Sequence, residues 1–331
     1  MSEGSAYYWP FNVPGWLGGA PDDWDWEQTR ILWGRPHPDS WKEVVFDRRL
    51  SVGIRVTAER WGLVRFDFQD WPPGMRSSVE NESFDFDVAV EVVMRRLKVM
   101  NIHLLMAHVA LLDIDNLATD TVHLSHFDIV NYRDDGMGGP GLWRIPFVVG
   151  HQDVGRHFVI GEGVLTRSVE LLDQVMSGSD THWEQYDLIL LGHSMFQQHD
   201  YAQALIAAWA VSEQLVSEKW RGYLAQLDRD VTLSDGTVVR RINADRRQAL
   251  VQNPDYPMAR VTQILELSDQ LDHELFRSLN TVRKSRNDWL HNLIRPDATS
   301  AALALTSACE LLTESTAIPV RLGLGRSISG P

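Results

Sequence analysis

Apolar residues in the second half of the chain recur every three or four positions, and this helical period constrains the fold more than any other feature. On residues 199–227 one apolar face includes Leu205, Trp209, Val216, Trp220 and Tyr223. Further helical segments are expected around 242–252, 257–268, 270–293 and 298–315. A short hairpin turning at Asp235-Gly236 interrupts the series. The pattern predicts an all-α bundle with one small insertion.

The first half of the chain follows a different pattern. The alternating runs "LSVGIRVTAE" and "WGLVRFDFQD" predict half-buried antiparallel strands. A long apolar segment near residues 87–113 carries Arg95, Arg96 and Lys98 at its middle, so it is expected to be a buried helix and not a membrane span. Strand-like runs follow at residues 122–132 and 142–149.

These patterns predict three parts of the chain. Residues 1–180 should form a tryptophan-rich α+β domain that ends near the Gly/Ser-containing "MSGSD". Residues 181–320 should form the helical bundle, and residues 321–331 a C-terminal tail. The fold class is therefore an α+β domain followed by an all-α bundle.

Composition limits the possible functions. The net charge of −14 restricts any nucleic-acid contact to a local basic patch. Cys309 is the only cysteine among 331 residues, which excludes an intrachain disulfide and a cysteine-based zinc cluster. The first residues lack a basic segment followed by an apolar run, so no secretory signal is expected. A cytoplasmic protein without membrane association is the prediction.

Three possible catalytic or binding signals are weak. "LILLGHSMF" resembles the nucleophile elbow of α/β-hydrolases, but Phe196 replaces its second glycine, so a Ser194 hydrolase is only a third hypothesis. "GEGVLT" at 161–166 lacks the residues of a phosphate-binding loop and more simply starts a helix. The pairs His103/His108 and His123/His126 match no metal-ligand spacing, so interior or surface histidines are expected.

One arginine stands where the helical pattern calls for an apolar residue. The apolar stripe of the segment from Leu271 to Leu293 comprises Leu271, Leu275, Leu279, Val282, Trp289 and Leu293. Arg286 falls within the same arc. A guanidinium there must meet a carboxylate, a partner chain or a bound anion, because it cannot lose its charge. The sequence is compatible with two roles for Arg286: a structural ion pair with Glu213, or a place in a functional site.

Asn287 and His291 are four residues apart and share a helix face, whereas Arg286 and His291 are separated by about 140°. A site built from these residues is therefore easier to assemble between two copies of the chain. Five basic residues and a single acidic one, Asp288, lie between residues 277 and 295, so this segment is basic within an acidic protein.

The run "RNDWLH" at 286–291 resembles the R-N-x-x-x-H motif of the HEPN superfamily of helical bundles. It lies late in a long helix, and "ATSAALALTSACELLTES" follows as a closing helix. The segment "DYAQALIAAWAVSEQLVSEKW" also looks like the early helix of the Apea-like branch. The resemblance covers about residues 185–317, does not extend to residues 1–180, and departs from the simplest bundle at the hairpin.

The resemblance implies a homodimer that cleaves RNA without a metal or cofactor. It implies that Arg286 stabilises the scissile phosphate, that Asn287 holds or orients it, and that His291 assists proton transfer at the ribose 2′-hydroxyl. Imidazole and guanidinium suit these roles because one titrates near neutral pH and the other is a fixed cation. The nearby RNA-binding side chains would be Arg283, Lys284 and Arg295, with Glu213 in a supporting position.

The leading hypothesis is thus an endoribonuclease effector of the kind associated with anti-phage defence, abortive infection or toxin systems. Its partners would be RNA, a second copy of the chain, and an unknown trigger or antitoxin that binds the N-terminal domain. The alternative is a non-catalytic HEPN module that serves nucleotide binding or dimerisation.

Overall fold

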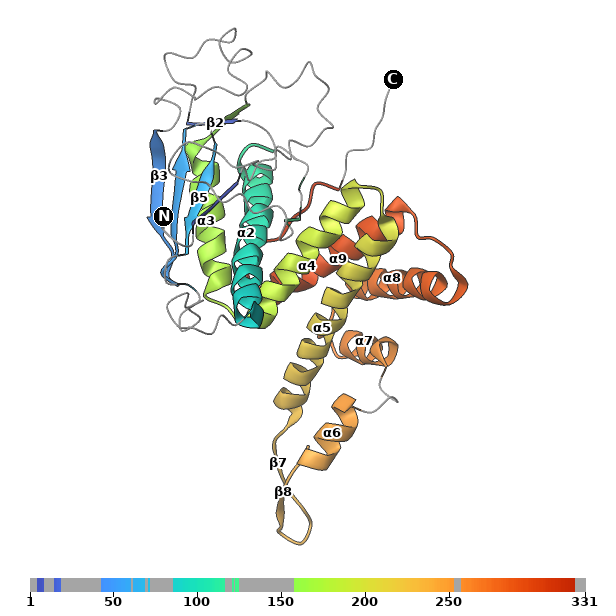
Figure 1. Cartoon of the computed structure of the whole chain (residues 1–331). Helices are drawn as coiled ribbons and strands as arrows, with labels where there is room; N and C mark the ends of the chain where they lie inside the picture. Colours follow the sequence, from blue (N-terminus) through green and yellow to red (C-terminus); the bar gives the residue numbers. More distant parts are fainter. Residues whose placement is uncertain are drawn as a thin grey trace. The chain divides into compact units, whose positions relative to one another are not determined.

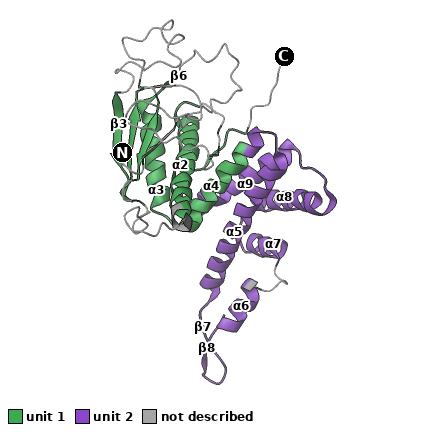
Figure 2. Ribbon diagram, viewed as in Figure 1, with its two compact units in different colours: residues 1–194, 318–331 green, residues 195–317 purple. Residues whose placement is uncertain are grey.

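The computed structural model describes residues 5–8, 15–18, 43–60, 62–68, 71, 86–116, 121, 123–124, 158–252 and 257–324. The chain divides into two compact units, residues 1–194 with 318–331 (unit 1) and residues 195–317 (unit 2) (Figure 2). A small sheet region precedes a mostly helical remainder (Figure 1). The prediction of an α+β part followed by helices is confirmed at this level.

Unit 1 contains a four-stranded antiparallel sheet with the strand order β1-β5-β4-β3. Its strands are β1 (Ser5–Tyr8), β5 (Val64–Asp67), β4 (Arg55–Glu59) and β3 (Val44–Arg49). A separate parallel pair joins β2 (Gly15–Leu17) to β6 (Phe158–Ile160). The two alternating sequence runs therefore form neighbouring strands, as predicted, while the strand-like runs at 122–132 and 142–149 lie almost wholly outside the described residues.

The sheet buries one face against two helices, α2 (Phe86–Ile114) and α3 (Glu162–Met176). Alternate residues of β4 and β5 are buried, as the period of a half-buried strand requires. Phe66 of β5 meets the ring of His103 edge-on, with ring centroids 5.3 Å apart. Arg48 of β3 donates to Glu170 of α3 over 3.3 Å, so both helices are joined to the sheet.

Helix α2 is long and apolar enough to cross a membrane by length and composition, but 78% of an apolar 18-residue stretch within Val90–Ile114 is buried inside the structure. Its two arginines have partners. Arg95 pairs with Glu91, and half-buried Arg96 donates to the carbonyl oxygens of Phe68 and Trp71. These features are those of a buried core helix, as the sequence predicts.

The unit boundary falls at residue 194, inside the continuous helix α4 (Asp180–Gln197), and not near residue 180 as the sequence indicates. The "MSGSD" segment contains only the short turn between α3 and α4. Most of α4 belongs to unit 1 because its polar side chains bond there. Asp187 accepts from the Asn101 amide at 2.8 Å, and His193 Nδ1 lies 2.8 Å from Thr121 Oγ1.

Residues 318–324 return to unit 1 after unit 2 is complete. Ile318 and Val320 are buried, and the Gly323 backbone N–H donates to His108 Nε2 at 3.1 Å. The expected tail at 321–331 therefore begins with residues that take part in unit 1, and residues 325–331 lie outside the described part.

Burial lowers the pKa of His103 and of His193 to about 3, with a smaller effect of His108 on His193. An unfolded histidine has a pKa of about 6.5. The folded state therefore binds fewer protons than the unfolded state between these values, so its stability is retained above about pH 6.5 and falls as the pH drops toward 3. Each histidine should contribute a slope of about 1.4 kcal/mol per pH unit in denaturant titrations.

Replacement of His103 by Gln should reduce that slope. Ser168→Ala is the matched control, because it removes the 3.1 Å contact between Ser168 Oγ and His103 Nε2 but keeps the imidazole. An unchanged slope in His103→Gln would contradict the prediction.

Unit 2 is a helical bundle with a small hairpin (Figure 1). Its elements are α5 (Tyr201–Leu227), β7 (Asp230–Thr232), β8 (Val238–Arg240), α6 (Ala244–Gln252), α7 (Met258–Leu267), α8 (His273–Asn292) and α9 (Ala298–Thr316). Helix α5 packs against α7, α8 and α9, and α8 packs against α7 and α9. The predicted helical segments and the hairpin at Asp235-Gly236 are confirmed.

Small residues allow α5 and α9 to pack closely. Ala204 and Ala208 of α5 and Ala304 and Ala308 of α9 are almost fully buried. Close-packed interiors tolerate little change in side-chain volume, so these alanines fix the spacing of the two helices. Cys309 is buried in the same helix, and burial raises the pKa of its thiol to about 12, so the thiol stays protonated at neutral pH.

Candidate functional site

The predicted catalytic residues lie in the last two turns of α8. The helix starts at the N-cap Asp272, whose carboxylate accepts from the backbone N–H groups of Glu274 (2.7 Å) and Leu275 (3.2 Å). Leu275, Leu279 and Val282 bury the first half of its apolar stripe. The helix is thus fixed at its start and buried on one face up to Val282, one turn before the motif.

Arg286 and Asn287 come together at the end of this buried stripe. Arg286 Nη1 donates to Asn287 Oδ1 over 3.0 Å. The Arg286 Nε atom is buried and has no hydrogen-bond partner among the described residues. A buried N–H group without an acceptor destabilises the folded state, and more so when it belongs to a cation. The Arg286 guanidinium can therefore still bind an anion.

The structural alternative for Arg286 was an ion pair with Glu213. Glu213 is half-buried on α5, but within the described residues no hydrogen bond or ion pair joins its carboxylate to Arg286. Lys219, further along α5, pairs instead with Glu314 of α9. No carboxylate in the described part of the chain therefore neutralises Arg286.

His291 is exposed in the last turn of α8. No hydrogen bond joins it to Arg286 in the described structure, as the angular separation on the helix predicts. None joins it to Asn287 there either, although the two residues share a helix face. Among the predicted RNA-binding residues, Lys284 and Arg295 are exposed and Arg283 is half-buried with its Nε atom lacking a partner in the described part. One chain therefore presents Arg286 and Asn287 together and His291 apart from them at the end of α8.

The end of α8 exposes apolar side chains beside the motif. Leu290, Leu293 and Ile294 are 46%, 76% and 59% exposed. The apolar stripe predicted up to Leu293 is therefore only partly confirmed: its last member lies in solvent, because the chain leaves the helix there. Leu293 has φ 55° and ψ 25°, a left-handed conformation that usually belongs to glycine. Leu293 thus combines a strained backbone with an exposed apolar side chain beside the candidate residues.

Leu293→Gly is expected to raise the free energy of unfolding of unit 2 by about 0.5–1 kcal/mol, because glycine adopts the left-handed C-cap without strain. The same change removes an exposed apolar side chain, so it should weaken self-association. Urea unfolding and light scattering measure the two effects. Leu290→Gly is the contrasting variant, since it lies within the helix and should destabilise it. A destabilised Leu293→Gly protein would contradict the argument from strain.

The weaker candidates take structural positions. Ser194 is buried within α4, so the strand-turn-helix of a nucleophile elbow is absent there and the hydrolase hypothesis is wrong. Gly161 is the N-cap of α3, a plain helix start. His123 lies 3.1 Å from Asp187 Oδ1, and His126 lies outside the described residues. Within the described residues, no group of three or more His, Cys, Asp or Glu side chains is placed to hold a metal ion.

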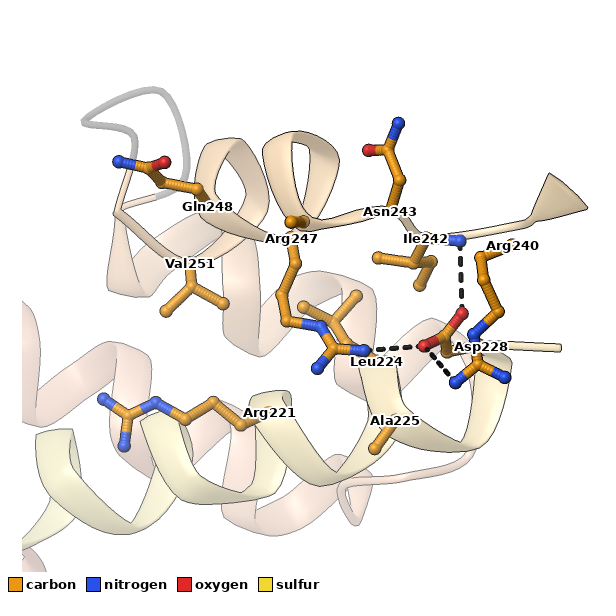
Figure 3. Close-up of a pocket in the computed structure, with 11 residues that line it drawn as sticks. Arg221, Leu224, Ala225, Asp228, Arg240, Ile242, Asn243, Arg247, Gln248 and Val251 are labelled. Atoms are coloured by element: carbon orange, nitrogen blue, oxygen red, sulfur yellow. Dashed lines mark hydrogen bonds and ion pairs between the residues drawn. The ribbon is translucent and has the colours of Figure 1, made fainter.

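Unit 2 contains a polar pocket that the sequence analysis does not predict. A pocket of about 720 Å³ lies where the end of α5, strand β8 and helix α6 meet (Figure 3). Its charged lining residues are Arg221, Asp228, Arg240 and Arg247. Several arginines lie between residues 221 and 247, and this clustering is the feature of the sequence that could have indicated the pocket. The spacing of these arginines matches no motif.

Comparisons with known proteins return no match: no family model fits the chain, and no curated protein or solved structure is detectably similar to it. The likeness of residues 286–291 to the HEPN motif consequently rests on these residues and on the helices around them.

Proposed function

We propose that the chain is a metal-independent endoribonuclease of the HEPN type, with an active site composed of the α8 ends of two protomers. The observation that carries the proposal is Arg286: it lies at the end of the buried stripe of α8, holds Asn287 at 3.0 Å, and has a buried Nε atom without an acceptor in the described structure. A scissile phosphate would supply the missing anion.

The proposed chemistry is divided between the imidazole of His291 and the guanidinium of Arg286. His291 accepts the proton of a ribose 2′-hydroxyl, and the 2′-oxygen attacks the adjacent phosphorus while the bond to the 5′-oxygen breaks. The departing 5′-oxygen takes up a proton from solvent water, and His291 later returns its proton to solvent. The products are a 2′,3′-cyclic phosphate and a 5′-hydroxyl end. Arg286 stabilises the charge on the phosphoryl oxygens in the transition state, and Asn287 orients Arg286 or the phosphate.

Dimer formation is part of the proposal because one α8 end keeps His291 apart from Arg286. The exposed Leu290, Leu293 and Ile294 supply apolar area for the contact. Lys284 and Arg295 are exposed on the same chain segment and would bind flanking phosphates of RNA. Unit 1 would respond to a trigger or antitoxin, as in the defence and toxin systems to which the motif's family is linked, in the cytoplasm.

The same exposed apolar residues favour one second candidate, a dimerisation module without catalysis. Both candidates predict a homodimer by light scattering. Only the nuclease predicts RNA cleavage that depends on the motif.

The test uses purified full-length protein, total RNA and EDTA, with mapping of the cleaved ends. The wild type should yield cyclic phosphate and 5′-hydroxyl ends without added metal. Arg286→Ala should lower the rate by roughly 10²-fold or more, as for the loss of a group that stabilises transition-state charge. Arg277→Ala is the matched control, since Arg277 is exposed on the first half of α8. Cleavage that EDTA abolishes and Mg²⁺ restores would contradict the proposal.

A further inference from the structure

The pocket at the end of α5 is built around one buried carboxylate. The Asp228 side chain is only 4% exposed. It accepts from Arg247 Nη2 at 2.6 Å, from Arg240 Nη2 at 3.2 Å and from the Ile242 backbone N–H at 3.3 Å (Figure 3). Asp228 thus joins β8 and α6 to the end of α5 and sets the direction of two guanidinium groups.

A second contact holds the opposite end of α6. The Trp220 indole N–H of α5 donates to the Leu250 carbonyl oxygen at 3.0 Å. Helix α6 is therefore fixed to α5 at both ends, and the pocket between them is a formed feature of unit 2. Its volume of about 720 Å³ lies within the range typical of small-molecule sites, about 300–1,000 Å³.

The charges of the pocket are unbalanced. Three arginines face one aspartate among its lining residues. Arg221 has no hydrogen bond or ion pair in the described structure, and Figure 3 shows its side chain running along α5 away from Asp228. Arg240 and Arg247 keep further N–H donors, because a guanidinium has five and each gives one to Asp228. Arg240 also lies 3.6 Å from Asp230, so two carboxylates face the three arginines and the charge of Arg221 is left over. This remaining positive charge favours an anionic ligand such as a phosphoryl group.

The remaining lining residues are mostly apolar. Leu224 and Ile242 are nearly buried, and Val251 and Ala225 complete this surface. The Asn243 side-chain oxygen accepts from the Arg246 backbone N–H at 2.8 Å, so it caps α6. Gln248 lines the pocket with an amide that makes no hydrogen bond within the described residues. The arginine can bind a phosphate, and the apolar surface and the Gln248 amide can contact a sugar and a base. These features together suit a nucleotide better than an inorganic ion.

We propose that this pocket binds a mononucleotide, with the phosphate on Arg221 and the base and ribose against Leu224, Ile242 and Val251. The site is separate from the α8 motif in its residues. The proposal does not depend on ribonuclease activity, because its measurement is binding.

The experiment is calorimetric titration of full-length protein with AMP, adenosine, inorganic phosphate and a short single-stranded RNA. AMP should bind more tightly than adenosine or phosphate alone. Arg221→Gln should weaken AMP binding by about tenfold or more, as expected for loss of a hydrogen bond to a charged group. It should also narrow the difference between AMP and adenosine. Because Arg221 has no partner in the described structure, the variant should keep the thermal stability of the wild type.

Arg229→Gln is the matched control, since Arg229 is exposed beside Asp228 but does not line the pocket. It should bind AMP as the wild type does. Equal AMP binding by Arg221→Gln and wild type, an absence of AMP binding, or binding of the RNA without AMP would each overturn the proposal. AMP binding that persists in Arg286→Ala supports a site distinct from the α8 motif.

Discussion

His291→Ala is expected to lower the rate of RNA cleavage by roughly 10²–10⁴-fold, the usual contribution of a general acid or base. The side chain is exposed in the last turn of α8 and makes no hydrogen bond in the described structure, so the substitution removes an imidazole and little packing. The variant should remain folded and dimeric. Initial rates on an unstructured RNA, with light scattering of the same sample, give both results.

His273→Ala provides the control for this prediction. His273 is the first residue of the same helix, its side chain is 65% exposed, and it lies 2.8 Å from Glu266. Its loss should leave cleavage within about twofold, which is the effect of a surface substitution. Equal loss of cleavage in both variants, or full activity in His291→Ala, would show that the imidazole of His291 is not part of the chemistry.

Phe66→Ala should destabilise unit 1 by about 3–5 kcal/mol, the usual cost of removing a buried phenyl ring. Phe66 is fully buried in β5, stacks on Phe68 with centroids 5.7 Å apart, and meets His103 of α2 edge-on. The loss would therefore weaken the packing of the sheet against α2. Urea unfolding monitored by circular dichroism measures the change in free energy.

Val44→Ala is the comparison in the same sheet. Val44 is 56% exposed in β3, so its truncation should cost less than about 0.5 kcal/mol. A Phe66→Ala protein as stable as Val44→Ala would mean that the sheet does not depend on this face for its packing.

The helical part of the fold can be predicted from the sequence because the spacing of the apolar residues and the positions of the capping residues indicate the same helices. Asp272 precedes the apolar positions of α8, and Asp297 caps α9 by accepting from the Ser300 backbone N–H at 2.8 Å. The position of Arg286 within the apolar stripe follows from the same period. Its bond to Asn287 does not, because adjacent residues on a helix do not face each other and only the long arginine side chain makes the contact.

Other features depend on contacts between residues far apart in the sequence. The end of unit 1 within α4 is set by bonds such as that of Asp187 to Asn101, which no local pattern signals. The pocket depends on Asp228 accepting from Arg240 and Arg247, residues 12 and 19 positions away. The exposure of Leu293 depends on a left-handed backbone that the sequence gives no reason to expect at a leucine.

The return of residues 318–324 to unit 1 affects the order in which the protein is completed during translation. Domains usually fold from the N-terminus as the ribosome adds about 5–20 residues per second. Here His108 receives the Gly323 N–H, and Val320 reaches its buried position, only after all of unit 2 has been synthesised. The ribosome thus synthesises every residue of unit 2 before it adds the last residues that pack into unit 1.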